Sequence, residues 1–232
     1  MKDDNREPKC VIIAAGDFPG VEIPIAQGDF VIACDAGVQH ARKLGIYPDL
    51  IVGDFDSARE AGGDLLSFIS AVAKEDPERV LQLEVKKDDT DTLQAVRIGL
   101  SRGYRTFMLY GMLGGKRFDH SFANIQTLLF IKHHGAKGYI ISREGMMLVA
   151  ENETVKFHRG NTGMLSVFSL SEVARGVTLK GLMYNLEDAT LTNDFPLGVS
   201  NEFIIDEEAE VTVSEGALLI TVYFGDQDSG AL

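Results

Sequence analysis

The sequence is poor in basic residues. Its 232 residues include 22 lysines and arginines against 35 aspartates and glutamates, which leaves a net charge of −13. Proteins that bind nucleic acid or anionic membranes concentrate positive charge, so we expect neither kind of partner. The acidity does not exclude phosphate chemistry, because a bound divalent cation reverses the local field.

Cysteines and long apolar segments are also scarce. The two cysteines, Cys10 and Cys34, lie inside apolar runs, which is typical of buried free thiols in a reducing compartment. No apolar stretch reaches the ~18 residues of a membrane span. The segment Met1–Lys9 lacks the apolar core of a signal peptide. We therefore expect a soluble cytoplasmic protein.

Short β-branched runs and amphipathic segments alternate over residues 1–143. Apolar residues at helical spacing predict helices over Thr92–Leu100 and Ser121–His134. Strands that are apolar throughout, with helices between them, indicate a mostly parallel sheet covered on both faces, and so an α/β domain. The expected strands are Val11–Ala15, Phe30–Cys34, Leu50–Val52, Val80–Val85, Thr106–Tyr110 and Gly138–Ile141.

The pattern changes over residues 144–232, where short strand-like runs are separated by turn signals and no long helical segment occurs. Eight short strands of this kind predict an all-β sandwich, jelly-roll-like in character. The expected strands are Met146–Val149, Glu153–His158, Gly163–Leu170, Val177–Leu182, Ala189–Thr192, Glu202–Asp206, Ala209–Val213 and Leu218–Phe224.

Acidic residues gather just after the predicted parallel strands. Because the carboxyl ends of parallel strands share one edge of the sheet, we expect these acids to meet in one crevice, where open α/β sheets bind their ligands. Taken alone, Asp35 also has a structural reading as a turn residue, and Asp89 with Thr90, and Asp119, have one as helix caps. The pair Asp54 and Asp56, directly after a buried strand, has little structural purpose. The residues in question are Asp35, Asp54, Asp56, Asp88, Asp89, Asp91 and Asp119.

Converging carboxylates repel one another, by ~4 kcal/mol per pair at ~4 Å and an effective dielectric of 20. A hard divalent cation with oxygen ligands removes this conflict, which favours Mg²⁺. Nearby Lys86, Lys87 and Arg117 supply positive charge for phosphate oxygens. Gly114 and Gly115 allow the backbone to approach an anion at the start of the following helix. The set is typical of metal-assisted transfer of nucleotide phosphates.

The motifs together resemble the thiamine pyrophosphokinase family in order and spacing. The resemblance covers nearly the whole chain, and the set of motifs is specific although each one alone is weak. The segments that carry it are Cys34–Gly37, Pro48–Ser57, Lys87–Asp91, Gly114–His120 with Asn124, Gly181–Leu186 and Ser200–Asn201.

The resemblance implies an enzyme that transfers the pyrophosphoryl group of ATP to the hydroxyl of thiamine, giving thiamine diphosphate and AMP. It implies a nucleotide-binding catalytic domain over residues 1–143 and a thiamine-binding and dimerisation domain over 144–232. It further implies a homodimer with active sites between subunits.

Residue roles follow from the same resemblance. Asp54, Asp56 and Asp91 would hold Mg²⁺ and the triphosphate. Arg117 and Asp119 would complete the phosphate and substrate side, with either Asp91 or Asp119 as the proton acceptor. The nucleotide side would further include Asp35, Lys87, Asp88, Thr90, Gly114 and Gly115.

The thiamine side would comprise Tyr184, Ser200 and Asn201. Tyr184 stands where many members of the family have a tryptophan that stacks on the thiamine ring, so an aromatic face is kept but is smaller. Ser200 and Asn201 would offer hydrogen bonds to the aminopyrimidine.

Three other functions remain open from the residues alone. Asp54-x-Asp56 after a strand resembles the nucleophile motif of haloacid-dehalogenase phosphohydrolases, although Gly53 and the β-rich second half fit that class poorly. A pyrophosphokinase acting on another hydroxymethyl heterocycle, such as a pterin, is a closer alternative. A sensing module without turnover is the third, but binding alone would gain from fewer mutually repelling charges.

Overall fold

The computed structural model describes residues 6–18, 20, 22–55, 63–84, 89–115 and 117–225. The chain divides into two compact units, unit 1 (Met1–Ser142) and unit 2 (Arg143–Leu232). No helix among the described residues has the length and apolar character to cross a membrane.

Unit 1 is built on six parallel strands in the order β6-β5-β1-β2-β3-β4. The central strands are buried over their whole length, as their continuously apolar sequences require. From β1 the chain adds β2, β3 and β4 on one side and then β5 and β6 on the other, so the strand order reverses between β1 and β5. Sheets of this kind bind ligands at that switch point. The strands are β1 (Cys10–Ile13), β2 (Phe30–Cys34), β3 (Leu50–Gly53), β4 (Val80–Gln82), β5 (Thr106–Tyr110) and β6 (Lys137–Ile141).

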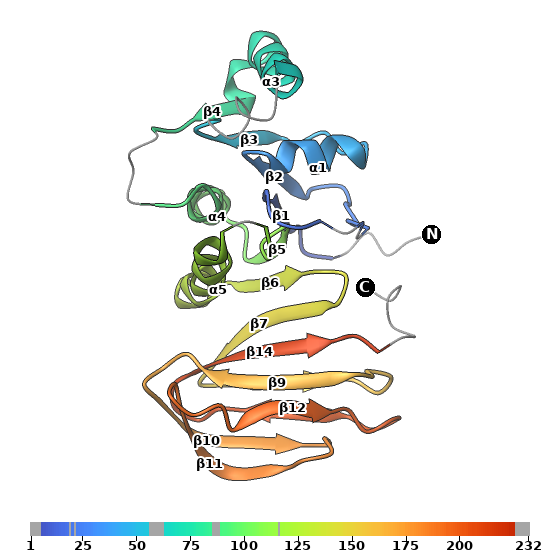
Figure 1. Ribbon diagram of the computed structural model, residues 1–232, viewed down its shortest axis with the longest axis vertical. Coiled ribbons are helices and arrows are strands. Elements are labelled where there is room, and N and C mark those ends of the chain that lie inside the picture. The colour runs from blue at the N-terminus through green and yellow to red at the C-terminus, as the bar shows by residue number, and fades with distance from the viewer. Residues whose placement is uncertain are drawn as a thin grey trace. The chain divides into compact units, whose positions relative to one another are not determined.

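Helices cover both faces of this sheet (Figure 1). On one face α1 (Gly37–Lys43) and α3 (Gly63–Glu75) pack on β2 and β3, where their apolar side chains form a common core. The other face carries α4 (Asp91–Ser101) and α5 (Phe118–His133). Both of the latter begin within three residues of their predicted starts.

Within the described ranges, the sequence analysis did not predict the helices α1 and α3. The seven-residue α1 begins at a glycine, so its pattern is too short to recognise. In α3 the buried Leu65, Ile69 and Val72 lie at positions i, i+4 and i+7, a signal that could have identified this helix.

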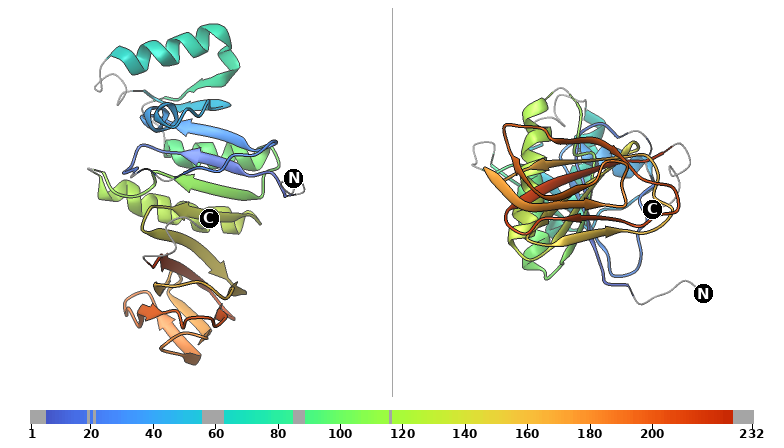
Figure 2. Two further views of the ribbon diagram at one scale, coloured as in Figure 1. Left: turned by 90° about the vertical axis from the view of Figure 1, so that its right-hand side faces the viewer. Right: turned by 90° about the horizontal axis from the view of Figure 1, so that it is seen from below.

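Unit 2 consists of two antiparallel four-stranded sheets, β12-β9-β14-β7 and β11-β10-β13-β8. The sandwich is visible from two further sides in Figure 2. Within it the rings of Phe157 and Phe203 meet edge to face, with their centroids 5.5 Å apart. The strands are β7 (Gly145–Glu151), β8 (Thr154–Phe157), β9 (Met164–Ser169), β10 (Val173–Lys180), β11 (Leu186–Thr192), β12 (Gly198–Glu202), β13 (Ala209–Thr212) and β14 (Ala217–Tyr223).

The predicted fold class, a mostly parallel α/β half followed by a β-sandwich, is confirmed. One strand was misplaced, because β12 covers Gly198–Glu202 and not Glu202–Asp206. The apolar run Phe203–Ile205 misled the prediction: Ile205 is 75% exposed and lies outside every strand. Strand β12 instead pairs with β9 through an irregular register between Gly198 and Asn201.

Candidate active site

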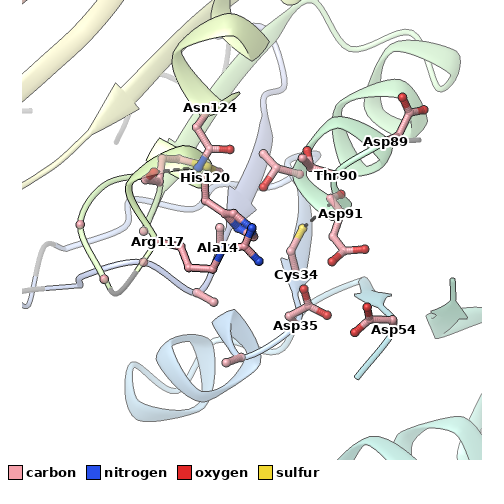
Figure 3. A pocket seen from close by; sticks show the side chains of 18 residues that line it. Ala14, Cys34, Asp35, Asp54, Asp89, Thr90, Asp91, Arg117, His120 and Asn124 are labelled. Carbon is pink, nitrogen blue, oxygen red and sulfur yellow. Dashed lines mark hydrogen bonds between the residues drawn. The ribbon is translucent and has the colours of Figure 1, made fainter. Parts of the chain in front are cut away.

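A cavity of about 710 Å³ opens at the carboxyl edge of the unit 1 sheet, at its switch point. Carboxylates line one side of it: Figure 3 shows Asp35, Asp54 and Asp91 directed toward one another. Arg117 and Asn124 enter from the other side. The predicted residues Thr90, Gly114 and Gly115 also line this cavity. The expected convergence of acids that follow separate strands is therefore present for Asp35, Asp54 and Asp91, but not for Asp119.

Asp35 is the most constrained of these acids. It follows β2 with a left-handed backbone, φ 48°. A Cβ at Gly53 would lie 2.0 Å from Asp35 Oδ1, so only glycine fits beside it. Among the described residues, Asp35 Oδ1 is buried without a hydrogen-bond partner. Burial, followed by hydrogen bonding to Asp91 and the charges of Asp91 and Asp54, raises the pKa of Asp35 to about 8.

Helix α4 places Asp91 in the cavity. Thr90 is the N-cap, and its hydroxyl accepts a hydrogen bond from Leu93 N at 3.1 Å. The structural reading of Thr90 as a helix cap is therefore correct, alongside its place on the cavity wall. The cap fixes the start of the helix, so Asp91, its first residue, is held at the cavity.

The neighbouring Asp89 is engaged elsewhere. Its carboxylate accepts from Gln94 Nε2 at 2.7 Å and pairs with Arg97 Nε at 3.3 Å. Figure 3 shows its side chain directed away from Asp35, Asp54 and Asp91. Both acids beside Thr90 line the cavity, but the carboxylate of Asp89 is bound to side chains of α4, whereas that of Asp91 faces Asp35 and Asp54.

The glycine-rich loop after β5 forms the opposite wall. Gly114 and Gly115 have φ values of 73° and 76°, which favour glycine. Buried Asn124 donates through Nδ2 to Met112 O at 2.7 Å and so fixes this loop from α5. Sequence reasoning quoted Asn124 in a motif but gave it no role.

Arg117 and Asp119 form an exposed ion pair at the start of α5. Hydrogen bonding to Arg117 lowers the pKa of Asp119. Arg117 lines the cavity, whereas Asp119 is absent from its described lining. The N-cap residue of α5 is Arg117, and its side chain forms no capping hydrogen bond. The interpretation of Asp119 as the N-cap is therefore wrong.

A further wall was missed in the sequence. Ala14–Gly16, directly after β1, line the cavity and interlock with the loop after β5. Gly16 N donates to Gly111 O at 2.8 Å, and a Cβ at Gly16 would lie 2.5 Å from that same oxygen. The glycine at the end of a buried strand was the available signal, because it marks a close approach of two backbones.

Four of the residues singled out in the sequence lie outside the described ranges: Asp56, Lys86, Lys87 and Asp88. Within the described ranges, no group of three His, Cys, Asp or Glu side chains forms a ready metal cage. Mg²⁺ commonly takes only one or two protein carboxylates and fills its shell with water and phosphate. The unpartnered Oδ1 of Asp35 and the all-oxygen donor set fit such an ion.

In unit 2 the predicted thiamine side separates into two exposed residues and a buried one. Tyr184 is 65% exposed and Ser200 is also exposed, with a left-handed φ of 60°. Asn201 is buried, and its amide binds the backbone of Tyr184 and Glu202. Contact of any of the three with a substrate stays a prediction.

Both units match models of one family. Residues 24–140 match the thiamin pyrophosphokinase catalytic domain, and residues 152–218 match the thiamin pyrophosphokinase vitamin B1 binding domain. The chain belongs to the thiamin pyrophosphokinase family. The resemblance in the motifs is thereby confirmed, and so is the prediction that the chain is an enzyme of this kind.

Similar proteins include a thiamine pyrophosphokinase of Bacillus subtilis, 29% identical over 197 residues, which are 82% of this chain and 85% of the relative. A thiamine pyrophosphokinase crystal structure from the same species has a TM-score of 0.80 at 25% identity, covering 94% of this chain and 99% of its own. Yeast thiamin pyrophosphokinase shares the fold, with a TM-score of 0.73 at 12% identity and coverage of 100% and 90%. The segment that matches the catalytic-domain model begins at residue 24 and so does not include Ala14–Gly16.

Proposed function

We propose that this protein is a Mg²⁺-dependent thiamine pyrophosphokinase that transfers the pyrophosphoryl group of ATP to the hydroxyl of thiamine, releasing AMP. The observation that carries the proposal is the meeting of Asp35, Asp54 and Asp91 with Arg117 around one cavity. A cavity with acids on one side and a guanidinium on the other suits a polyphosphate held together with a cation.

In the proposed reaction the hydroxyl oxygen of thiamine forms a bond to the β-phosphorus of ATP, and the bond from that phosphorus to the oxygen bridging the α-phosphate breaks. Transfer of this kind depends mainly on alignment and on stabilisation of charge. Arg117 binds phosphate oxygens, and the backbone of Gly114 and Gly115 lies against them at the start of α5.

The hydroxyl proton passes to a carboxylate. Asp91 lines the cavity, whereas Asp119 is bound to Arg117, which lowers the pKa of Asp119 and weakens it as a base. Both stay candidates, with the geometry favouring Asp91.

Asp54, Asp91 and the neighbouring Asp35 would hold the Mg²⁺, with Asp56 as a further predicted ligand. When bound, the ion would neutralise phosphate charge. Lys87, Asp88 and Thr90 belong to the predicted nucleotide side, where Thr90 keeps the start of α4 in place. Thiamine is proposed to lie against the segments around Tyr184 and Ser200–Asn201.

A homodimer with active sites between subunits and a cytoplasmic location stay predictions. The shared site is tested by mixing Asp54→Ala protein with Tyr184→Ala protein, at a thiamine concentration too low for Tyr184→Ala protein alone to turn over. Recovery of activity in the mixture supports sites built from two subunits, and a monomer in light scattering contradicts them.

The reaction itself is tested by mass spectrometry of the products after incubation with ATP, Mg²⁺ and a panel of hydroxymethyl compounds. We expect AMP and thiamine diphosphate in equal amounts, formed only when thiamine and Mg²⁺ are both present. AMP formed with a pterin and not with thiamine would reassign the substrate. Free phosphate would indicate a phosphohydrolase, and binding of both ligands without AMP would indicate a sensing module.

A further inference from the structure

The side chain of Asn201 is the centre of a hydrogen-bond network in unit 2. Its Oδ1 accepts from Tyr184 N at 3.0 Å and from Glu202 N at 2.9 Å. Its Nδ2 donates to Tyr184 O at 2.6 Å. The amide thus binds both backbone polar groups of Tyr184, as a neighbouring strand would.

The orientation of this amide follows from its partners. Two backbone N–H donors face Oδ1, and a carbonyl faces Nδ2. Rotating the amide by half a turn would set its NH₂ group against two donors. Asn201 is only 4% exposed, so water does not replace a lost partner easily. The bonds therefore hold the Tyr184 backbone in one place.

The backbone around Asn201 is shaped for this contact. The pairing of β12 with β9 is irregular between Gly198 and Asn201, and Ser200 has a φ of 60°. Ser166 Oγ accepts from Ser200 N at 2.9 Å, which stabilises the irregularity. Irregularities of this kind redirect side chains, and here the result is that Asn201 is turned inward toward the Tyr184 segment.

Tyr184 is exposed to solvent although its backbone is held by hydrogen bonds. The residue is 65% exposed and lies in the connection between β10 and β11. Beside it, Met183 N donates to Glu202 O at 2.9 Å, so the same strand end holds two consecutive residues. An exposed aromatic ring on a fixed backbone loses little freedom when a flat ligand stacks on it, which favours binding.

We infer that Asn201 is a positioning residue that acts on substrate through Tyr184, by holding its backbone, and does not itself contact the substrate. The inference rests on the proposed function, in which Tyr184 stacks on the thiamine ring. On this inference the hydrogen bond predicted from Asn201 to the aminopyrimidine is not formed: its oxygen already has two donors, one N–H of its amide is used on a carbonyl, and the residue is buried.

The absence of tryptophan from the chain provides a direct test. The Tyr184→Trp variant has a single tryptophan, whose fluorescence anisotropy and quenching by acrylamide report on this one segment. In that background Asn201→Asp removes the donor to Tyr184 O and keeps the acceptor, whereas Asn201→Ser removes the whole amide without adding a charge. Asn161→Asp is the matched control, since Asn161 Nδ2 donates to His158 O at 2.7 Å elsewhere in unit 2.

Without any ligand, we expect lower anisotropy and stronger quenching in both Asn201 variants and no change in Asn161→Asp. Circular dichroism on each protein shows that it is folded. Unchanged anisotropy in a folded Asn201→Ser protein would overturn the inference.

Steady-state kinetics on the chain with its native Tyr184 then separates positioning from direct contact. Asn201→Asp should raise the KM for thiamine roughly tenfold with little change in kcat or in the KM for ATP. In a Tyr184→Ala background the same change should have almost no further effect, because the ring it positions is gone. Equal effects in both backgrounds would indicate direct contact and would overturn the inference.

A failure of the proposed function can be distinguished from a failure of this inference. If the variants lose anisotropy as expected but none responds to thiamine, Tyr184 is positioned by Asn201 and thiamine is not the ligand.

Discussion

Two aspartates flank the same strand and have opposite surroundings. Asp29 precedes β2, and its carboxylate accepts from Lys9 N and Ala26 N, both at 2.9 Å, and from the guanidinium of Arg6. Asp35 follows β2, and in the described structure its Oδ1 is buried with no partner. Asp29 lies at the amino edge of the sheet and Asp35 at the carboxyl edge, where the cavity opens.

The difference separates an acid that stabilises the fold from one that is held ready for a ligand. Asp29 has a hydrogen-bond donor for each of its oxygens, so its charge is compensated within the chain. Asp35 is surrounded by other carboxylates, and its pKa is raised to about 8 by burial and by Asp91 and Asp54. Groups of this kind are common at functional sites and are tolerated at a cost in stability.

The largest effect is expected on the functional side. Asp54→Ala should lower turnover by roughly 10²–10³-fold, because a group that stabilises charge in the transition state is lost. The free energy of unfolding should change little, since Asp54 is only half-buried. Turnover with saturating Mg²⁺, together with urea unfolding, measures both. Near-normal turnover in the purified variant would contradict the role of Asp54 at the metal.

The structural side is tested by Asp29→Asn. All three partners of Asp29 are donors, so the NH₂ group of asparagine must face one of them and the charge opposite Arg6 is lost. We expect a loss of about 2–3 kcal/mol in the free energy of unfolding. Turnover per folded molecule should be unchanged, and a selective fall in turnover would break the contrast between the two acids.

Asp35→Asn is the matched change at the other end of β2. With its pKa raised to about 8, Asp35 must take up a proton at neutral pH to stay buried beside Asp91 and Asp54. Asparagine avoids that cost, so the free energy of unfolding should rise by about 1 kcal/mol. Turnover should fall roughly tenfold, since a candidate ligand for the cation is lost. Urea unfolding in the presence of EDTA isolates the stability effect. A loss of stability like that of Asp29→Asn would show that Asp35 is a structural acid.

How much of this was predictable depends on the range of the interactions involved. The strands of unit 1 are apolar throughout, and Thr90 caps α4 by a local bond to Leu93, so sequence patterns suffice for both. The shared position of Asp35, Asp54 and Asp91 at one edge of the sheet follows from parallel topology, so it could also be predicted.

Interactions between segments that are distant in the sequence could not be predicted from it. The wall formed by Ala14–Gly16 depends on the loops after β1 and β5 meeting at the switch point. The bonds from Asn201 to Tyr184 join residues 17 positions apart, through an irregular strand that no periodicity reveals. The position of β12 was misjudged for the same reason, because pairing with β9 outweighs the apolar run that follows it.

The smallest effect on stability is expected at His40, a residue of α1 that contacts the cavity wall at Gly16. Its Nε2 bonds to Gly16 O at 3.1 Å, and its ring stacks on Phe18 with centroids 5.0 Å apart. Burial lowers the pKa of His40, and the charge of Lys43 lowers it further, while the bond to Gly16 and the charge of Asp17 raise it by less.

The sign of the pH dependence follows from that lowered pKa. The unfolded chain binds a proton at His40 near the ordinary pKa of about 6.5, whereas the folded chain binds it only at lower pH. His40 therefore lowers the free energy of unfolding progressively as the pH falls below about 6.5, and this loss levels off below the folded pKa. His40→Gln should remove that contribution, so that the variant loses less stability than the parent between pH 7.5 and pH 5.5. Urea midpoints at the two pH values measure the difference, with the exposed His158→Gln as control. An equal loss in the parent and in His40→Gln would mean that burial of His40 does not influence its titration.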